Sequence, residues 1–179
     1  MPENFEPQPE EKEEEPTMTF RDLRIEDCDK MLEIRNRAVL EEKVPFGNRK
    51  ELKKEDFLPK FVKLLEMASK GEAIDVAAEI DGNLVGWIAG HNVLNAEVPT
   101  ASADVIMMDK KTRSLKNFLA LTQRWVDRVQ QEWGSKKLAT ATQVENARVI
   151  KLYKRYGLKE TGFFKKEGTE YVEMEKDLE

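Results

Sequence analysis

Residues 143–163 read QVENARVIKLYKRYGLKETGF. Asn146, Val149, Ile150 and Tyr153 are spaced so that they fall on one face of a helix. Gly157 suits the left-handed position that follows a helix C-terminus. The residues before this stretch, 138–142, are typical of a strand. The sequence therefore predicts a strand that turns directly into an amphipathic helix over 146–156, with the face of these four residues directed back at the gap between that strand and the preceding one.

The segments on either side alternate between strand and helix patterns. Strands are expected at 18–23, 74–80, 84–91, 101–108 and 138–142, followed by two short strands about Gly168, and helices near 26–39, 56–69, 114–133 and 146–156. Pro59 fits only near the first turn of its helix, and Gly86 and Gly90 predict a bulge or a close approach of another backbone. The order β-α-α-β-β-β-α-β-α-β-β predicts an α/β fold: a mixed sheet of about seven strands flanked by four helices, with a parallel crossover between 101 and 142.

Charge divides the 179-residue chain unevenly. Residues 1–17 hold seven Glu, one Lys and four Pro, a composition that cannot bury enough apolar surface to order itself. We expect a disordered acidic tail over 1–17, either solvated or binding a partner, and one domain over 18–179. That domain has 28 acidic and 29 basic residues, so it lacks the excess of positive charge that a nucleic-acid-binding domain carries.

Several classes of protein are disfavoured by what the sequence lacks. No window approaches the roughly 20 apolar residues that span a bilayer, so no membrane partner is expected. Cys28 is the only cysteine and His91 the only histidine, which leaves no internal disulfide and no Cys/His metal cluster. We expect a cytoplasmic protein with no bound metal.

The quoted stretch resembles the N-x-x-A/V-x-x-L-Y-x-K/R-x-G-F…G-F run of the GCN5-related N-acetyltransferases. The residues that carry the likeness are Asn146, Val149, Leu152–Tyr153, Arg155, Gly157–Leu158 and Gly162–Phe163. The order of elements over 18–179 also matches that family's fold. The resemblance implies an acyltransferase that moves acetyl from acetyl-CoA to a small-molecule or peptide amine by direct attack in a ternary complex, as a monomer or homodimer.

The resemblance also assigns roles to residues. In the family, the pantetheine arm of acetyl-CoA inserts between the fourth and fifth strands, which puts the backbone amides of Ile106, Met107 and Met108 at the pantetheine and the thioester. Tyr153 would protonate the departing thiolate, and Asn146 would bind the pantetheine or orient a water. The structural alternatives are a core aromatic at 153 and a helix cap at 146.

The family's pyrophosphate loop is rich in glycine, whereas residues 108–117 contain none. Lys111, Arg113 and Ser114, with Lys110 and Thr112, could replace amide contacts by side-chain contacts to phosphate. A basic run at a helix N-terminus is electrostatically unfavourable without an anion, which favours that interpretation. The alternative is a degenerate domain that no longer uses acetyl-CoA and binds another protein.

The general base is the least determined role. Asp104, expected on the strand face shared by Ile106 and Met108, is one candidate, although it could equally point to solvent. Glu79 is the corresponding acid on an earlier strand. His91, at a strand end, is expected to be a surface or hydrogen-bonded residue, and Thr140 and Thr142 could line the acetyl channel.

Overall fold

The computed structural model describes residues 17–41 and 50–179, which form a seven-stranded mixed sheet with four α-helices. The strand order is β1-β2-β3-β4-β5-β7-β6. The predicted succession of strands and helices is confirmed. The acidic tail, apart from Thr17, lies outside the described residues.

The elements begin and end within a few residues of their predicted positions. The strands are β1 (Met18–Arg21), β2 (Ala73–Ile80), β3 (Asn83–Asn92), β4 (Thr100–Met108), β5 (Lys137–Gln143), β6 (Lys159–Lys166) and β7 (Thr169–Asp177). The helices are a short 3-10 turn (Ile25–Asp27), α1 (Cys28–Leu40), α2 (Lys54–Ser69), α3 (Leu115–Trp133) and α4 (Ala147–Tyr156). Because α2 begins at Lys54, Pro59 lies in its second turn, so the prediction of a first-turn proline was wrong.

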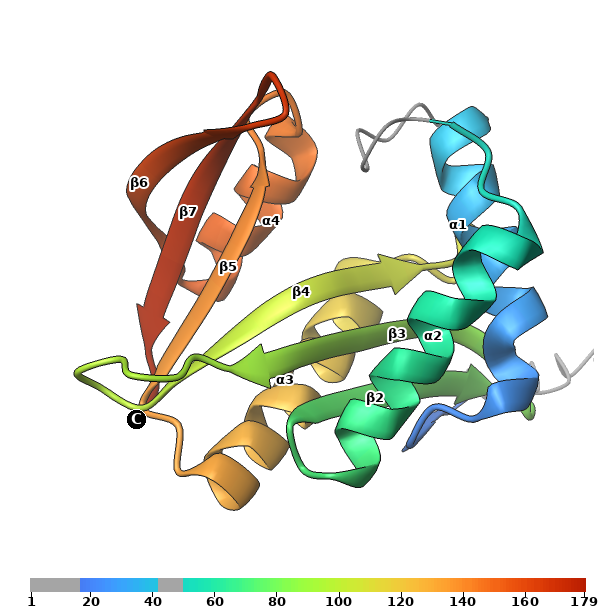
Figure 1. Ribbon diagram of the computed structural model, residues 1–179, viewed down its shortest axis with the longest axis horizontal. Helices are drawn as coiled ribbons and strands as arrows, with labels where there is room; N and C mark the ends of the chain where they lie inside the picture. Colours follow the sequence, from blue (N-terminus) through green and yellow to red (C-terminus); the bar gives the residue numbers. More distant parts are fainter. Residues whose placement is uncertain (1–16, 42–49) are drawn as a thin grey trace, which may run out of the picture.

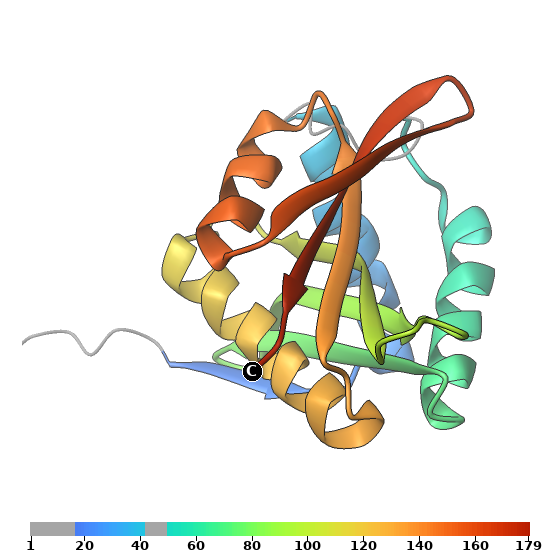
Figure 2. The same ribbon diagram turned by 90° about the vertical axis from the view of Figure 1, so that its left-hand side faces the viewer.

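Helices cover the two faces of the sheet unequally (Figures 1 and 2). α1 and α2 pack on one face of the β1–β4 half, while α3 and α4 pack on the other face. In Figure 1, β5, β7 and β6 stand apart from α1 and α2, which leaves the near face of these three strands without a helix. We call the side of α1 and α2 the front face and the side of α3 and α4 the back face.

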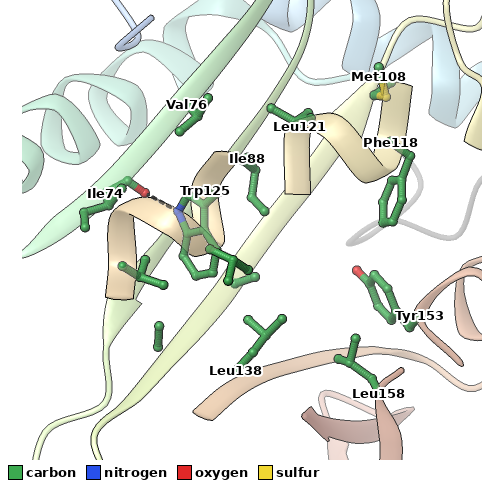
Figure 3. Packing of buried hydrophobic residues seen from close by; sticks show 14 of the residues in the cluster. Ile74, Val76, Ile88, Met108, Phe118, Leu121, Trp125, Leu138, Tyr153 and Leu158 are labelled. Carbon is green, nitrogen blue, oxygen red and sulfur yellow. Dashed lines mark hydrogen bonds between the residues drawn. The ribbon is translucent and has the colours of Figure 1, made fainter. Parts of the chain in front are cut away.

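Trp125 anchors the larger of the two hydrophobic clusters. It is fully buried on α3, and its indole Nε1 donates a hydrogen bond of 2.8 Å to the carbonyl oxygen of Ile74 on β2 (Figure 3). The same cluster contains Phe118 from α3 and Tyr153 from α4. It therefore joins both back-face helices to the centre of the sheet.

A bulge interrupts the pairing of β3 with β4. Ala89 pairs with Val105 and Gly90 with Ala103, so residue 104 has no partner on β3. A Cβ atom at Gly90 would lie 2.0 Å from the carbonyl oxygen of Ser102. The prediction that Gly90 allows a bulge and a close approach is confirmed, and glycine is required at this point because any side chain would collide with the neighbouring strand.

Candidate active site

β4 and β5 are paired over only part of their length. The parallel register runs from Thr100 opposite Lys137 to Ala103 opposite Thr140 and ends there. Beyond this point β4 continues beside β3 and β5 continues beside β7, and the two strands diverge in Figure 1. The expected opening in the middle of the sheet is therefore present, with the peptide groups of residues 104–108 along one side.

A pocket with an empty volume of about 660 Å³ lies against this opening. Six of the nine site residues predicted from the sequence line it: Ile106, Met107, Met108, Arg113, Asn146 and Tyr153. The remaining lining residues are Ala38, Phe118, Arg148, Val149 and Leu152. The pocket thus combines the end of β4, the start of α3, one residue of α1 and the predicted face of α4.

Tyr153 forms the inner wall of the pocket. Only 8% of it is exposed, and its ring lies 6.4 Å from that of Phe118 (Figure 3). Burial raises the pKa of its phenol, while a side-chain interaction with Thr140 acts in the opposite direction. Tyr153 is therefore both a core aromatic and a pocket residue, and its hydroxyl stays protonated at neutral pH.

Asn146 occupies the N-cap position of α4, but its side chain makes no capping hydrogen bond. Its amide nitrogen instead donates to the hydroxyl of Thr142 on β5, at 3.4 Å, and the residue lines the pocket. The helix start does not depend on the Asn146 side chain, which leaves that side chain's carbonyl oxygen available to a ligand.

The glycine-free loop between β4 and α3 is held together by a buried carboxylate. Asp109 accepts a hydrogen bond from the backbone N–H of Lys111 at 3.0 Å and forms an ion pair with Arg37 of α1, also at 3.0 Å. Ser114 caps α3 by accepting from the N–H of Asn117. Arg113 donates to the carbonyl oxygen of Met108 at 2.9 Å. Of the three predicted loop residues, Arg113 therefore lines the pocket, whereas the backbone of Lys111 and the hydroxyl of Ser114 are used within the loop.

Asp104 does not join this pocket. Its carboxylate Oδ2 lies 2.7 Å from Nδ1 of His91. His91 alternates along β3 with Trp87, which packs in the front-face cluster, whereas Ile106 and Met108 pack with the back-face cluster. The prediction that Asp104 shares a face with Ile106 and Met108 was wrong, because the bulge at residue 104 shifts the alternation of side chains along β4 by one.

Two further predicted candidates occupy different places. Glu79 forms an ion pair of 2.7 Å with Arg21, which also binds Asp27, at the far side of the sheet. Thr140 lies at the last paired position of β5 and donates to the carbonyl oxygen of Ala103 at 2.9 Å. Thr140 therefore lies at the base of the opening, while Glu79 links β2 to β1 through its ion pair with Arg21.

A second, more open groove lies on the front face of the sheet. It has an empty volume of about 1,070 Å³ and is bordered by the β3–β4 loop and by β4, β5, β6 and β7. Thr140 lines this groove and also an enclosed space beside Tyr153. Thr140 therefore lies between the front groove and the space beside Tyr153, at the point where β4 and β5 separate.

Arg148 is the main pocket residue that the sequence analysis did not single out. It lies in the first turn of α4, is exposed, and lines the same pocket as Arg113. Its position two residues after Asn146 was a usable signal, because a cation near a pocket of this kind can bind phosphate. Ala38 could not have been found in this way, since α1 reaches the pocket only through tertiary packing.

Among the described residues, no group of His, Cys, Asp and Glu could hold a metal ion. No helix in the same part of the chain is long and apolar enough to cross a membrane.

Comparison with solved structures identifies the fold. A GNAT superfamily phosphinothricin acetyltransferase from Sinorhizobium meliloti in complex with acetyl-CoA superimposes with a TM-score of 0.71 at 19% identity, over 90% of this chain and 89% of that one. The PaiA N-acetyltransferase from Thermoplasma acidophilum in complex with coenzyme A gives 0.68 at 17%, over 90% and 99%. A ribosomal-protein-alanine N-acetyltransferase from Brucella melitensis gives 0.70 at 20%, over 89% and 99%. No protein-family profile and no curated protein matches the sequence. The chain therefore has the fold of the GCN5-related N-acetyltransferases.

Proposed function

We propose that this protein is an N-acetyltransferase that transfers acetyl from acetyl-CoA to an amine by direct attack in a ternary complex. The observation that carries the proposal is the separation of β4 from β5 after Ala103 and Thr140, with the Tyr153 pocket against it. Two of the three solved structures compared above contain acetyl-CoA or coenzyme A. The acceptor is a small molecule or a peptide with a free amine.

The peptide groups of β4 would hold the acetyl donor. Ile106, Met107 and Met108 border the pocket on the side of β4 that faces away from β3. Backbone N–H groups at this edge can bind the pantetheine amides and stabilise the negative charge that develops on the thioester oxygen. Asn146, whose side chain does not cap α4, supplies a further polar contact to the same arm.

Tyr153 would act as the general acid. The amine nitrogen forms a bond to the thioester carbonyl carbon, the carbon–sulfur bond breaks, and the phenol of Tyr153 gives its proton to the departing thiolate. The amine loses one proton in the same reaction, so the products are an amide and free CoA thiol. The raised pKa of Tyr153 supports this role, because the phenol remains protonated until the thiolate forms.

The phosphates of CoA would be bound by side chains rather than by a glycine-rich backbone. Arg113 and Arg148 both line the pocket, one at the start of α3 and the other at the start of α4. Lys111 and Lys110 are exposed in the adjacent loop and add positive charge there. Guanidinium groups bind phosphate oxygens through paired hydrogen bonds, which fits a loop whose Lys111 amide is already bonded to Asp109.

A thermal-shift titration tests whether the pocket binds the donor. Acetyl-CoA is expected to raise the melting temperature because it binds the folded state only. Arg148→Ala should weaken binding of acetyl-CoA more than binding of acetyl-pantetheine, which lacks the phosphates. Arg155→Ala, on an exposed position of the same helix, is the matched control. The absence of any shift at millimolar acetyl-CoA would refute the proposal and favour a binding module that has lost the cofactor.

Tyr153→Phe tests the chemical role. It should leave the acetyl-CoA affinity nearly unchanged and lower kcat for acetyl transfer by about 100-fold or more, the usual contribution of a positioned acid. Tyr156→Phe is the matched control, because the Tyr156 hydroxyl bonds only to the exposed side chain of Gln123 among the described residues. Equal turnover in the two variants would remove Tyr153 from the mechanism.

A further inference from the structure

His91 and Asp104 form a hydrogen-bonded pair that the pocket on the back face does not include. The ring Nδ1 of His91 lies 2.7 Å from Oδ2 of Asp104, and the two side chains are 44% and 52% exposed. A pair this exposed contributes little to stability. What the geometry does achieve is to hold one ring nitrogen against a carboxylate, which leaves Nε2 as the nitrogen that can accept a proton.

The bulge in β4 turns Asp104 to the front face and so places the His91–Asp104 pair beside the opening. Asp104 is the β4 residue without a partner on β3, and it directly follows Ala103, the last β4 residue paired with β5. His91 pairs with Ser102, which lines the front groove. The His91–Asp104 pair therefore lies on the front face, between the start of the groove and the point where the two strands diverge.

The groove provides a route for an acceptor that does not compete with the donor. The pocket is lined by Phe118 and Tyr153 from the back face and also by Ala38 and Met107 from the front-face cluster. The groove lies on the front face, and Thr140 borders both the groove and the enclosed space beside Tyr153. An amine that enters through the groove would approach the thioester from the side opposite Tyr153. It would reach the opening beside Ser102, the groove residue whose partner on β3 is His91.

We propose that His91, oriented by Asp104, is the general base that removes a proton from the acceptor amine. This inference rests on the proposed acetyl transfer. As the carbon–nitrogen bond forms, Nε2 of His91 takes one proton from the nitrogen, and Tyr153 gives one proton to the thiolate as the carbon–sulfur bond breaks. Solvent then removes the proton from His91 and returns one to Tyr153, so the protons balance. Asp104 is a positioning residue, because it acts through the imidazole and not on the amine itself.

The test uses the full chain, acetyl-CoA and a simple primary amine, butylamine, as the acceptor probe, with release of CoA thiol as the readout. His91→Ala should lower kcat by about 100-fold and leave the acetyl-CoA thermal shift unchanged. Added imidazole should restore part of the lost rate, which a purely structural role for His91 would not allow. Asp104→Asn should give a smaller loss of kcat. Asn92→Ala, the next residue along β3, is the control and should keep the wild-type rate.

The outcomes separate the two proposals. If the wild-type chain shows no thermal shift with acetyl-CoA, the proposed function is wrong. If acetyl-CoA binds but butylamine releases no CoA thiol, or if His91→Ala keeps the wild-type kcat, the inference about His91 is wrong while donor binding stands. A reduced rate that imidazole does not restore would also count against His91 as the base.

Discussion

Substituting Gly90 by Ala tests the bulge on which the layout of both faces depends. The new Cβ atom would lie 2.0 Å from the carbonyl oxygen of Ser102 and 2.6 Å from Cζ2 of Trp125. Ordinary carbon contacts are about 3.5–4.0 Å, so β3 and β4 would have to separate by more than 1 Å next to a fully buried indole. Overpacking a core typically costs about 1–3 kcal/mol. Because one collision here is with backbone, we expect a loss of about 3 kcal/mol.

Gly162→Ala is the matched control for this prediction. A Cβ at Gly162 would meet the carboxylate Oε2 of Glu173 at 2.7 Å, and the next atom lies at 3.8 Å. That carboxylate is the end of a flexible side chain, so we expect a change within about 0.5 kcal/mol. In differential scanning calorimetry, Gly90→Ala should lower the melting temperature by about 6–12 °C. Equal melting temperatures for the two variants would refute the close approach of Ser102 to β3.

Two further predictions concern stability alone. Burial raises the pKa of Asp75, whose carboxylate accepts a hydrogen bond from the N–H of Leu23 at 2.6 Å. The stabilising contribution of the protonated carboxyl group is therefore complete below the unfolded pKa near 3.8. It is lost as the pH rises through the higher pKa of the folded state. Asp75→Asn keeps an acceptor oxygen, so urea unfolding should show the variant gaining stability relative to wild type between about pH 4 and 7; a constant difference over that range would contradict this. Trp125→Phe removes the 2.8 Å bond to Ile74 and should cost at least about 1–3 kcal/mol in the same assay. Trp133→Phe, which loses an exposed bond, should cost clearly less, and equal losses would refute the role of the buried bond.

Hydrophobic periodicity was sufficient to predict the main helices, because each of them buries a stripe of its own residues. β6 buries no residue, and it was predicted from the turn at Gly168. The helix around Val149 and Tyr153 was predicted within one residue of its start, and Gly157 marked its end. The opening between β4 and β5 followed only from the family resemblance. Nothing in the alternation of apolar residues along 101–108 indicates where the pairing with β5 stops.

The face of Asp104 could not be predicted by assuming regular alternation along the strand. A bulge adds one residue to one strand and so reverses the face of every side chain on one side of it. The signal was present in Gly90, but it lies on the neighbouring strand, and only the register shows that residue 104 is the extra one. Ala38 could not be predicted for a related reason, since it reaches the pocket only through the packing of α1.

The two faces of the sheet perform different parts of the proposed reaction, and the short β4–β5 pairing is what connects them. The hydroxyl of Thr140 bonds to the carbonyl of Ala103 at the last paired position, so the base of the opening is fixed by a side chain as well as by the ladder. One residue further along β4, the bulge turns Asp104 to the front face, while Tyr153 remains on the back face. An acid and a base placed on opposite sides of one carbonyl group can act in the same step without exchanging protons directly. The irregularity in β4 is therefore the feature on which the proposed arrangement of acid and base depends.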